Sequence, residues 1–119
     1  MDKSILQTAC KRCAKDCHVL SAKIACILTA PDYTHVTVNK RGGILDREWT
    51  LHAERLMCDK IKRERWPYPG ECNITVIRFR KDGSLACARP CSMCDKVLRK
   101  TGVRHVWYTN EMGVLERLF

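Results

Sequence analysis

The feature that most constrains the fold is the alternation of helix-like and strand-like segments along the 119 residues. Apolar residues at helical spacing predict helices over residues 6–20, 51–65 and 91–102. Runs of apolar and β-branched residues predict strands between and after them. These strands are expected over residues 23–30, 35–39, 73–80, 84–88, 103–109 and 114–119. This order predicts an α/β fold in which helices cover a sheet.

Three connecting segments in this pattern carry further information. Residues 110–113 join the last two strands, a length that allows a hairpin but not a crossover, so this pair should be antiparallel. Gly102 follows the last helical segment, where a residue with positive φ often ends a helix. Residues 40–49 are polar and contain Gly42 and Gly43, so they are expected to form a loop.

Length and composition place the chain in a broad class. Residues 1–119 are enough for one domain with a buried core, and the 45% apolar content argues against disorder. No apolar run reaches the roughly 18 residues of a membrane span. The first residues lack the features of a signal peptide, so we expect an intracellular, cytoplasmic protein, with the nucleus as a second location, and not a secreted one.

Cysteine is unusually frequent, with nine residues. An odd number without an export signal argues against a disulfide framework and leaves metal binding, catalysis or buried thiols. Cys91 and Cys94 are three positions apart at the start of a predicted helix, so one turn brings both sulfurs towards one metal ion. His52 and Glu54 lie where another helix is entered, and there both side chains can approach one ion.

The residues His52-Ala53-Glu54 and Pro90-Cys91-Ser92-Met93-Cys94 match H-x-E followed by P-C-x-x-C, the signature of the zinc deaminases. From about Ile5 to its end, the chain resembles the cytidine deaminase superfamily. The resemblance implies a three-layer α-β-α sandwich around a mixed five-stranded sheet. The short link before the last strand resembles the free-cytidine and blasticidin deaminases, which often form tetramers, so a homo-oligomer is expected.

The resemblance also implies the roles of the site residues. His52, Cys91 and Cys94 would hold one catalytic Zn²⁺, and Glu54 would carry protons without binding the metal. Asn39, near the end of the second predicted strand, is the candidate for holding a sugar. The implied enzyme is a cytidine or deoxycytidylate-type hydrolase that converts the amine of a cytosine-type nucleoside or nucleotide to a carbonyl and releases ammonia.

Two other functions stay open. The formal charge of +9 favours a polyanion or a nucleotide as ligand, so a deaminase acting on single-stranded DNA or RNA is an alternative. Its nucleic acid would bind a basic surface, for which the candidates are Lys60, Lys62, Arg63, Arg65, Arg78, Arg80 and Lys81. The other alternative is a non-catalytic, zinc-stabilised binding or assembly module that reuses the fold.

The remaining cysteines and aromatic residues have simpler interpretations. Cys10, Cys13 and Cys17, with His18, have the spacing of a second zinc site, but the cysteines share a helical stripe with leucines, which favours core packing. Core positions are expected for Cys26 and Cys87, whereas Cys58 and Cys72 are left open. Trp66, Trp107 and Tyr108 could stack on a base, but core packing is expected for the pair in the strand.

Overall fold

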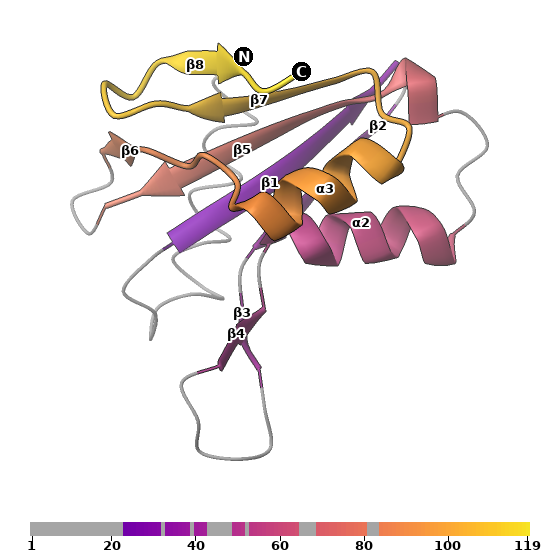
Figure 1. Ribbon diagram of the computed structural model, residues 1–119, viewed down its shortest axis with the longest axis horizontal. Coiled ribbons are helices and arrows are strands. Elements are labelled where there is room, and N and C mark those ends of the chain that lie inside the picture. The colour runs from indigo at the N-terminus through magenta and orange to yellow at the C-terminus, as the bar shows by residue number, and fades with distance from the viewer. Residues whose placement is uncertain are drawn as a thin grey trace.

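The computed structural model describes residues 23–31, 33–38, 40–42, 49–51, 53–64, 69–80 and 84–119 (Figure 1). The first predicted helix, with Cys10, Cys13, Cys17 and His18, lies outside these residues. So do Asn39, His52, Arg65, Trp66 and Lys81. Within the described part of the chain, no helix is long and apolar enough to cross a membrane.

A mixed sheet forms the centre of the described structure, with the strand order β2-β1-β5-β7-β8. The strands are β1 (Lys23–Ala30), β2 (Tyr33–Val38), β5 (Asn73–Phe79), β7 (His105–Thr109) and β8 (Leu115–Arg117). β1 is antiparallel to both β2 and β5, β5 is parallel to β7, and β7 and β8 form the predicted antiparallel hairpin. A short strand, β6 (Leu85–Ala86), lies within the extended segment expected at residues 84–88 and pairs with β5 outside this path. The sheet therefore has six strands, one more than the resemblance implies.

One prediction about the polar segment was wrong. Residues 40–49 were expected to form a loop and Leu51 to begin a helix, but β3 (Lys40–Gly42) and β4 (Trp49–Leu51) pair as an antiparallel ribbon. Lys40 lies opposite Leu51 and Gly42 opposite Trp49. Residues 40–42 form a strand only through backbone pairing with residues 49–51, because the sequence KRG has no apolar alternation that would reveal a strand.

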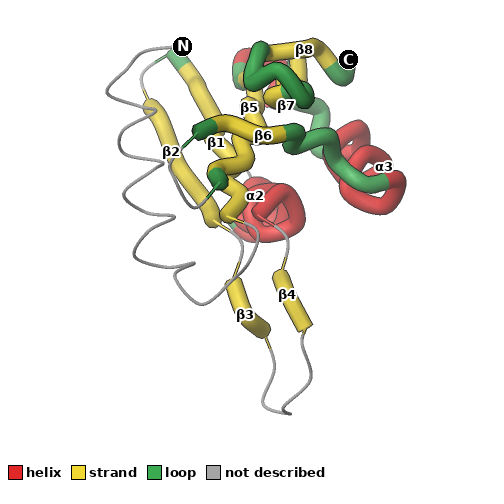
Figure 2. Tube along the Cα trace, turned by 90° about the vertical axis from the view of Figure 1, so that its left-hand side faces the viewer, coloured by secondary structure: helices red, strands yellow, loops and turns green. Residues whose placement is uncertain are grey.

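Two helices of the described residues, α2 (Ala53–Arg63) and α3 (Ser92–Lys100), lie next to each other on one side of the sheet (Figure 2). A single turn of 3-10 helix, η1 (Pro69–Glu71), follows α2. The inner sides of α2 and α3 are buried against the strands. This contact includes Met57, Ile61 and Leu98 of the helices and Ile74, Val76 and Val106 of the strands. Gly102 has φ 83°, which confirms the expected end of α3.

The opposite face of the sheet is also buried. Its apolar side chains alternate with those of the first face along β1, β2 and β5, as the strand period requires. They are Ala25, Ile27, Val36, Val38, Ile77 and Phe79. A sheet with two buried faces is what the three-layer class requires.

Candidate active site

The first turns of α2 and α3 meet at one end of the sheet and carry three of the four residues implicated by the motifs. Glu54 is the second residue of α2, and its side chain is 4% exposed although it is acidic. Cys91 has an extended backbone (φ −66°, ψ 167°) and caps α3, so the helix begins just after it. Cys94 lies in the first turn and is 5% exposed, whereas Cys91 is exposed. The site therefore has a buried side and an open side.

Cys94 links the other two side chains. Its thiol lies within hydrogen-bonding reach of the side chains of Cys91 and Glu54. Burial raises the pKa of Cys94 well above its ordinary value, and the negative charge of Glu54 raises it further. A thiolate in this position therefore needs a nearby positive charge.

A divalent metal fits this donor set. Two sulfurs one helical turn apart are a common pair of zinc ligands, and the positive end of the α3 dipole favours their ionised forms. The buried carboxylate of Glu54 beside Cys94 adds negative charge that a cation would compensate. His52, the fourth motif residue, directly precedes α2 in the sequence and lies outside the described residues, so its role as a ligand stays a prediction.

A further thiol lies beneath the contact and was not predicted to be near it. Cys26, in the middle of β1, is fully buried, which confirms its expected core position. Its side chain is hydrogen-bonded with Thr37 of β2. Burial raises its pKa well above the ordinary value, and charges on Glu54, Cys58 and Cys94 contribute further. The raised pKa keeps the Cys26 thiol neutral beneath the site. Cys58, left open by the sequence, is buried too.

The segment leading into Cys91 is fixed by Thr109 at the end of β7. The Thr109 hydroxyl, 1% exposed, donates to the carbonyl of Ala86 at 2.6 Å. The backbone N–H of Ala88 donates to the carbonyl of Thr109 at 2.8 Å. Because Arg89, Pro90 and Cys91 follow Ala88 in the chain, these bonds position the start of α3. A threonine ending a strand has no distinctive sequence signal, so this role could not be predicted.

The other residues singled out in the sequence divide into core and surface. Tyr108 is 3% exposed, which confirms core packing, and its hydroxyl donates to the Glu116 carboxylate. The Arg89 guanidinium lies 5.8 Å from the centre of the Tyr108 ring. Trp107 is half-buried, and so is Cys87, which was expected to be fully in the core. Cys87 was placed wrongly because it follows β6, a strand only two residues long.

Comparisons with known proteins support the fold and the family. No curated protein gives a significant match to the sequence. The chain is similar in structure to cytidine deaminase from Burkholderia pseudomallei, with a TM-score of 0.66 at 20% identity, covering 98% of this chain and 91% of the other. Cytidine deaminase from Mycobacterium leprae gives a TM-score of 0.60 at 16% identity, covering 94% and 88%. At these identities the likeness shows the fold.

The family follows from the sequence itself. Residues 1–110 match the model described as the cytidine and deoxycytidylate deaminase zinc-binding region. This range contains both motifs and most of the described sheet. The chain therefore belongs to the zinc-binding family of cytidine and deoxycytidylate deaminases.

Proposed function

We propose that this protein is a zinc-dependent hydrolase that replaces the exocyclic amine of a cytosine-type base with a carbonyl oxygen. Water is consumed and ammonia is released. The observation that carries the proposal is the buried carboxylate of Glu54, hydrogen-bonded with the Cys94 thiol at the start of the two helices. Membership of the family supports the same chemistry.

In this proposal His52, Cys91 and Cys94 hold one zinc ion. When bound, zinc supplies the positive charge that keeps both thiols ionised and makes hydroxide available near pH 7. Cys91 and Cys94 lie together at the start of α3, one helical turn apart. Since Cys91 is exposed and Cys94 buried, a substrate would approach from the Cys91 side.

Glu54 is proposed to move protons rather than to bind the metal. Its carboxylate takes a proton from water as the oxygen attacks the carbon that bears the amine. It protonates the adjacent ring nitrogen and later passes a proton to the departing ammonia. Burial suits this role, because a carboxylate shielded from solvent exchanges protons with the substrate rather than with bulk water.

A free nucleoside or nucleotide is the proposed substrate. The antiparallel β7–β8 hairpin supports this choice, since it is the layout that resembles deaminases of free cytidine. Two proteins with a similar fold are named as cytidine deaminases. Asn39 is the proposed sugar contact, from its place just after β2.

A substrate screen with metal analysis on the same sample tests the proposal. Ammonia release is measured with cytidine, deoxycytidine, their monophosphates, adenosine, guanine and blasticidin. We expect about one zinc per chain and turnover of at least one cytosine compound. If zinc is bound but neither the cytosine compounds nor a single-stranded oligonucleotide is turned over, the protein is a zinc-stabilised binding module and the proposal is wrong.

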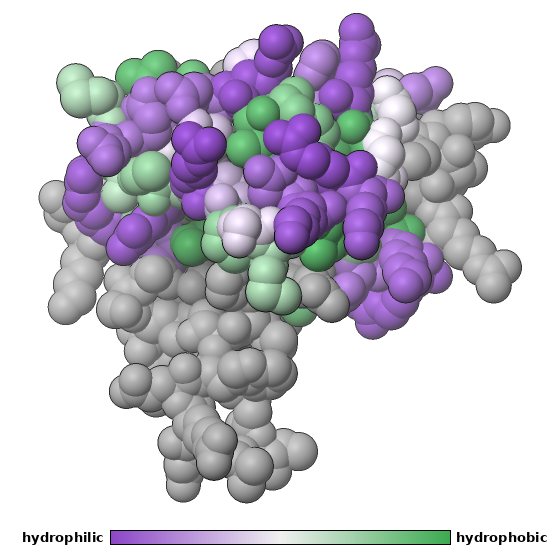
Figure 3. All heavy atoms as spheres, viewed as in Figure 1, coloured by the Kyte–Doolittle hydropathy of each residue, from purple (hydrophilic) through white to green (hydrophobic). Residues whose placement is uncertain are grey.

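One observation favours a second enzyme, a deaminase of single-stranded DNA or RNA. Besides the overall charge, the face shown in Figure 3 is mainly hydrophilic where described residues are coloured, and Lys62, Arg63, Arg78 and Arg80 are exposed. Deamination of an oligonucleotide, without turnover of free nucleosides and with binding that weakens steeply in salt, would select this alternative.

A further inference from the structure

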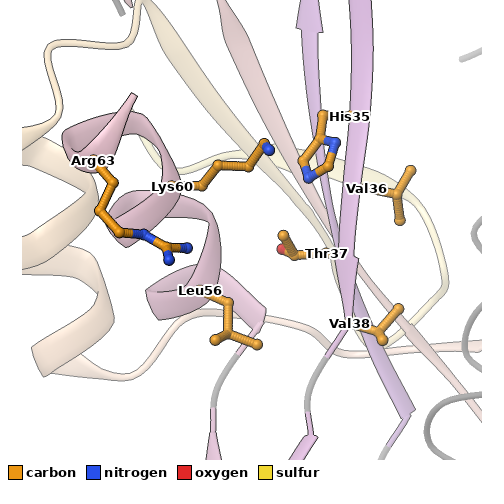
Figure 4. Close-up of a pocket in the computed structure, with 7 residues that line it drawn as sticks. All are labelled: His35, Val36, Thr37, Val38, Leu56, Lys60 and Arg63. Carbon is orange, nitrogen blue, oxygen red and sulfur yellow. The ribbon is translucent and has the colours of Figure 1, made fainter. Parts of the chain in front are cut away.

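A second polar hollow lies away from the motif residues, between the strand β2 and the helix α2 (Figure 4). Its volume is about 210 Å³. His35 and Thr37 reach it from β2, and Lys60 and Arg63 reach it from α2, with Leu56 closing its lower end in the view of Figure 4. The size suits a small charged group rather than a whole nucleoside.

The periods of the two elements explain why these side chains meet. His35 and Thr37 are two positions apart on a strand, so both point to the side of the sheet that carries α2. Lys60 and Arg63 are three positions apart on a helix, so they share the face turned towards β2. Two basic side chains and an imidazole thus line one hollow from separate elements.

The chain already places one carboxylate in the field of these groups. The Lys60 ammonium donates to Glu64 Oε1 at 2.7 Å. This hydrogen bond, followed by the positive charges of Lys60, His35 and Arg63, lowers the pKa of Glu64. The cluster therefore stabilises a negatively charged oxygen. Glu64 lies just beyond α2 with its side chain 45% exposed, so it can turn towards solvent and yield to another anion.

The hollow is separated from the proposed catalytic groups. Lys60 and Arg63 follow Glu54 by six and nine residues, or roughly 9 and 14 Å along the helix axis at ~1.5 Å per residue. The Thr37 side chain lies between the two places, since it lines the hollow and is hydrogen-bonded with Cys26. The charge of Glu54 is felt at that Cys26 thiol. The hollow is thus distinct from the proposed catalytic site, and the Thr37–Cys26 contact connects the two.

We propose that this hollow binds the phosphoryl group of a small phosphorylated ligand. A phosphate dianion matches the set, because Arg63 can donate two parallel hydrogen bonds and Lys60 supplies a point charge. His35 adds a third donor from the opposite wall. A single half-open hollow with two basic side chains favours a terminal phosphate over a nucleic-acid backbone, which needs a row of contacts. This inference does not depend on deaminase activity.

Calorimetric titration with inorganic phosphate, cytidine monophosphate and a short single-stranded oligonucleotide tests the site. The double variant Lys60→Gln/Arg63→Gln removes two cations from the hollow. Lys62→Gln/Arg104→Gln is the matched control, because it removes the same charges from exposed positions outside the hollow. We expect phosphate to bind the wild-type chain saturably, at least tenfold more weakly in the first variant, and within twofold of wild type in the control.

A third variant protects the test against misfolding of the first. Glu64→Gln removes the competing carboxylate from an exposed position and should tighten phosphate binding about threefold. Circular dichroism checks that each variant is folded. The proposal is overturned if phosphate does not saturate, if both double variants weaken binding equally, or if Glu64→Gln weakens it. Binding of the oligonucleotide alone, with equal losses in both double variants, would mean diffuse attraction and also overturns it.

Discussion

The two ends of helix α2 carry opposite chemistry. Its first turn holds the buried Glu54, and its last turn holds Lys60, Lys62 and Arg63. Both signs are favourable for the helix dipole, which is positive at the start and negative at the end. The two ends differ in burial and in their neighbours. The buried Glu54 raises the pKa of Cys26 and Cys94 beside it. At the other end, the basic groups around the exposed Glu64 lower the pKa of its carboxyl group. The described side chains at the buried end are thus acidic or thiol groups, whereas the open end carries Lys60 and Arg63.

The largest expected effect comes from breaking the buried end. Cys94→Ala removes one sulfur of the proposed metal site and should abolish stoichiometric zinc binding together with ammonia release. Water cannot replace a thiolate ligand without a large loss of affinity for zinc. Metal content is measured by mass spectrometry. Cys87→Ala is the control, since Cys87 is a half-buried thiol outside the motif. Full zinc content in Cys94→Ala would contradict the assignment.

The packing beneath that end gives the next effect. Leu98 of α3 is fully buried against the sheet. Leu98→Ala should lower the free energy of unfolding by about 2–5 kcal/mol, from lost burial and the cavity left behind. Urea denaturation measures this change. Met93→Ala, at a position of α3 that is 69% exposed, should change it by less than about 0.5 kcal/mol. Similar losses in both variants would mean that α3 is not anchored by Leu98.

The connection into the motif gives a smaller effect. Thr109→Val replaces a buried hydroxyl that donates to the Ala86 carbonyl, and should cost about 1–3 kcal/mol because this buried hydrogen bond is lost. Thr109→Ser keeps the hydroxyl and should recover most of the loss. Both are compared by urea denaturation of the metal-free protein. If the serine variant is as unstable as the valine variant, the hydrogen bond is not what Thr109 contributes.

The smallest effect belongs to the open end of α2. Because the pKa of Glu64 is lowered in the folded chain, its pairing with Lys60 stabilises the fold above the ordinary glutamate pKa of about 4.3. This contribution is lost as the pH falls through the lowered value. The Tm difference between wild type and Glu64→Gln should therefore be small at pH 7 and vanish at strongly acid pH. A difference that grows on acidification would reverse the sign argued here.

The sequence predicted the features that depend on neighbouring residues. Cys91 and Cys94 share a helical turn, Gly102 ends α3, and four residues force a hairpin between β7 and β8. Glu54 was placed near both thiols by its motif, and the structure brings it into contact with Cys94.

Features that depend on which strand lies beside which could not be predicted. The ribbon of β3 and β4 exists only through pairing across the chain. Cys26 meets the site because β1 lies next to β5 in the middle of the sheet, and no local pattern encodes that order. His35 is brought to Lys60 and Arg63 in the same way. The roles of His52 and Asn39, and the stripe of Cys10, Cys13 and Cys17, stay predictions.

The most direct test of the central claim is Glu54→Gln, assayed for zinc and for ammonia release with the best cytosine substrate. Glutamine keeps the shape of the side chain but cannot carry a proton. The account predicts about one zinc per chain, as in wild type, and a rate lowered by about 10²–10⁴-fold or more. A variant that keeps its zinc and deaminates at the wild-type rate would contradict it.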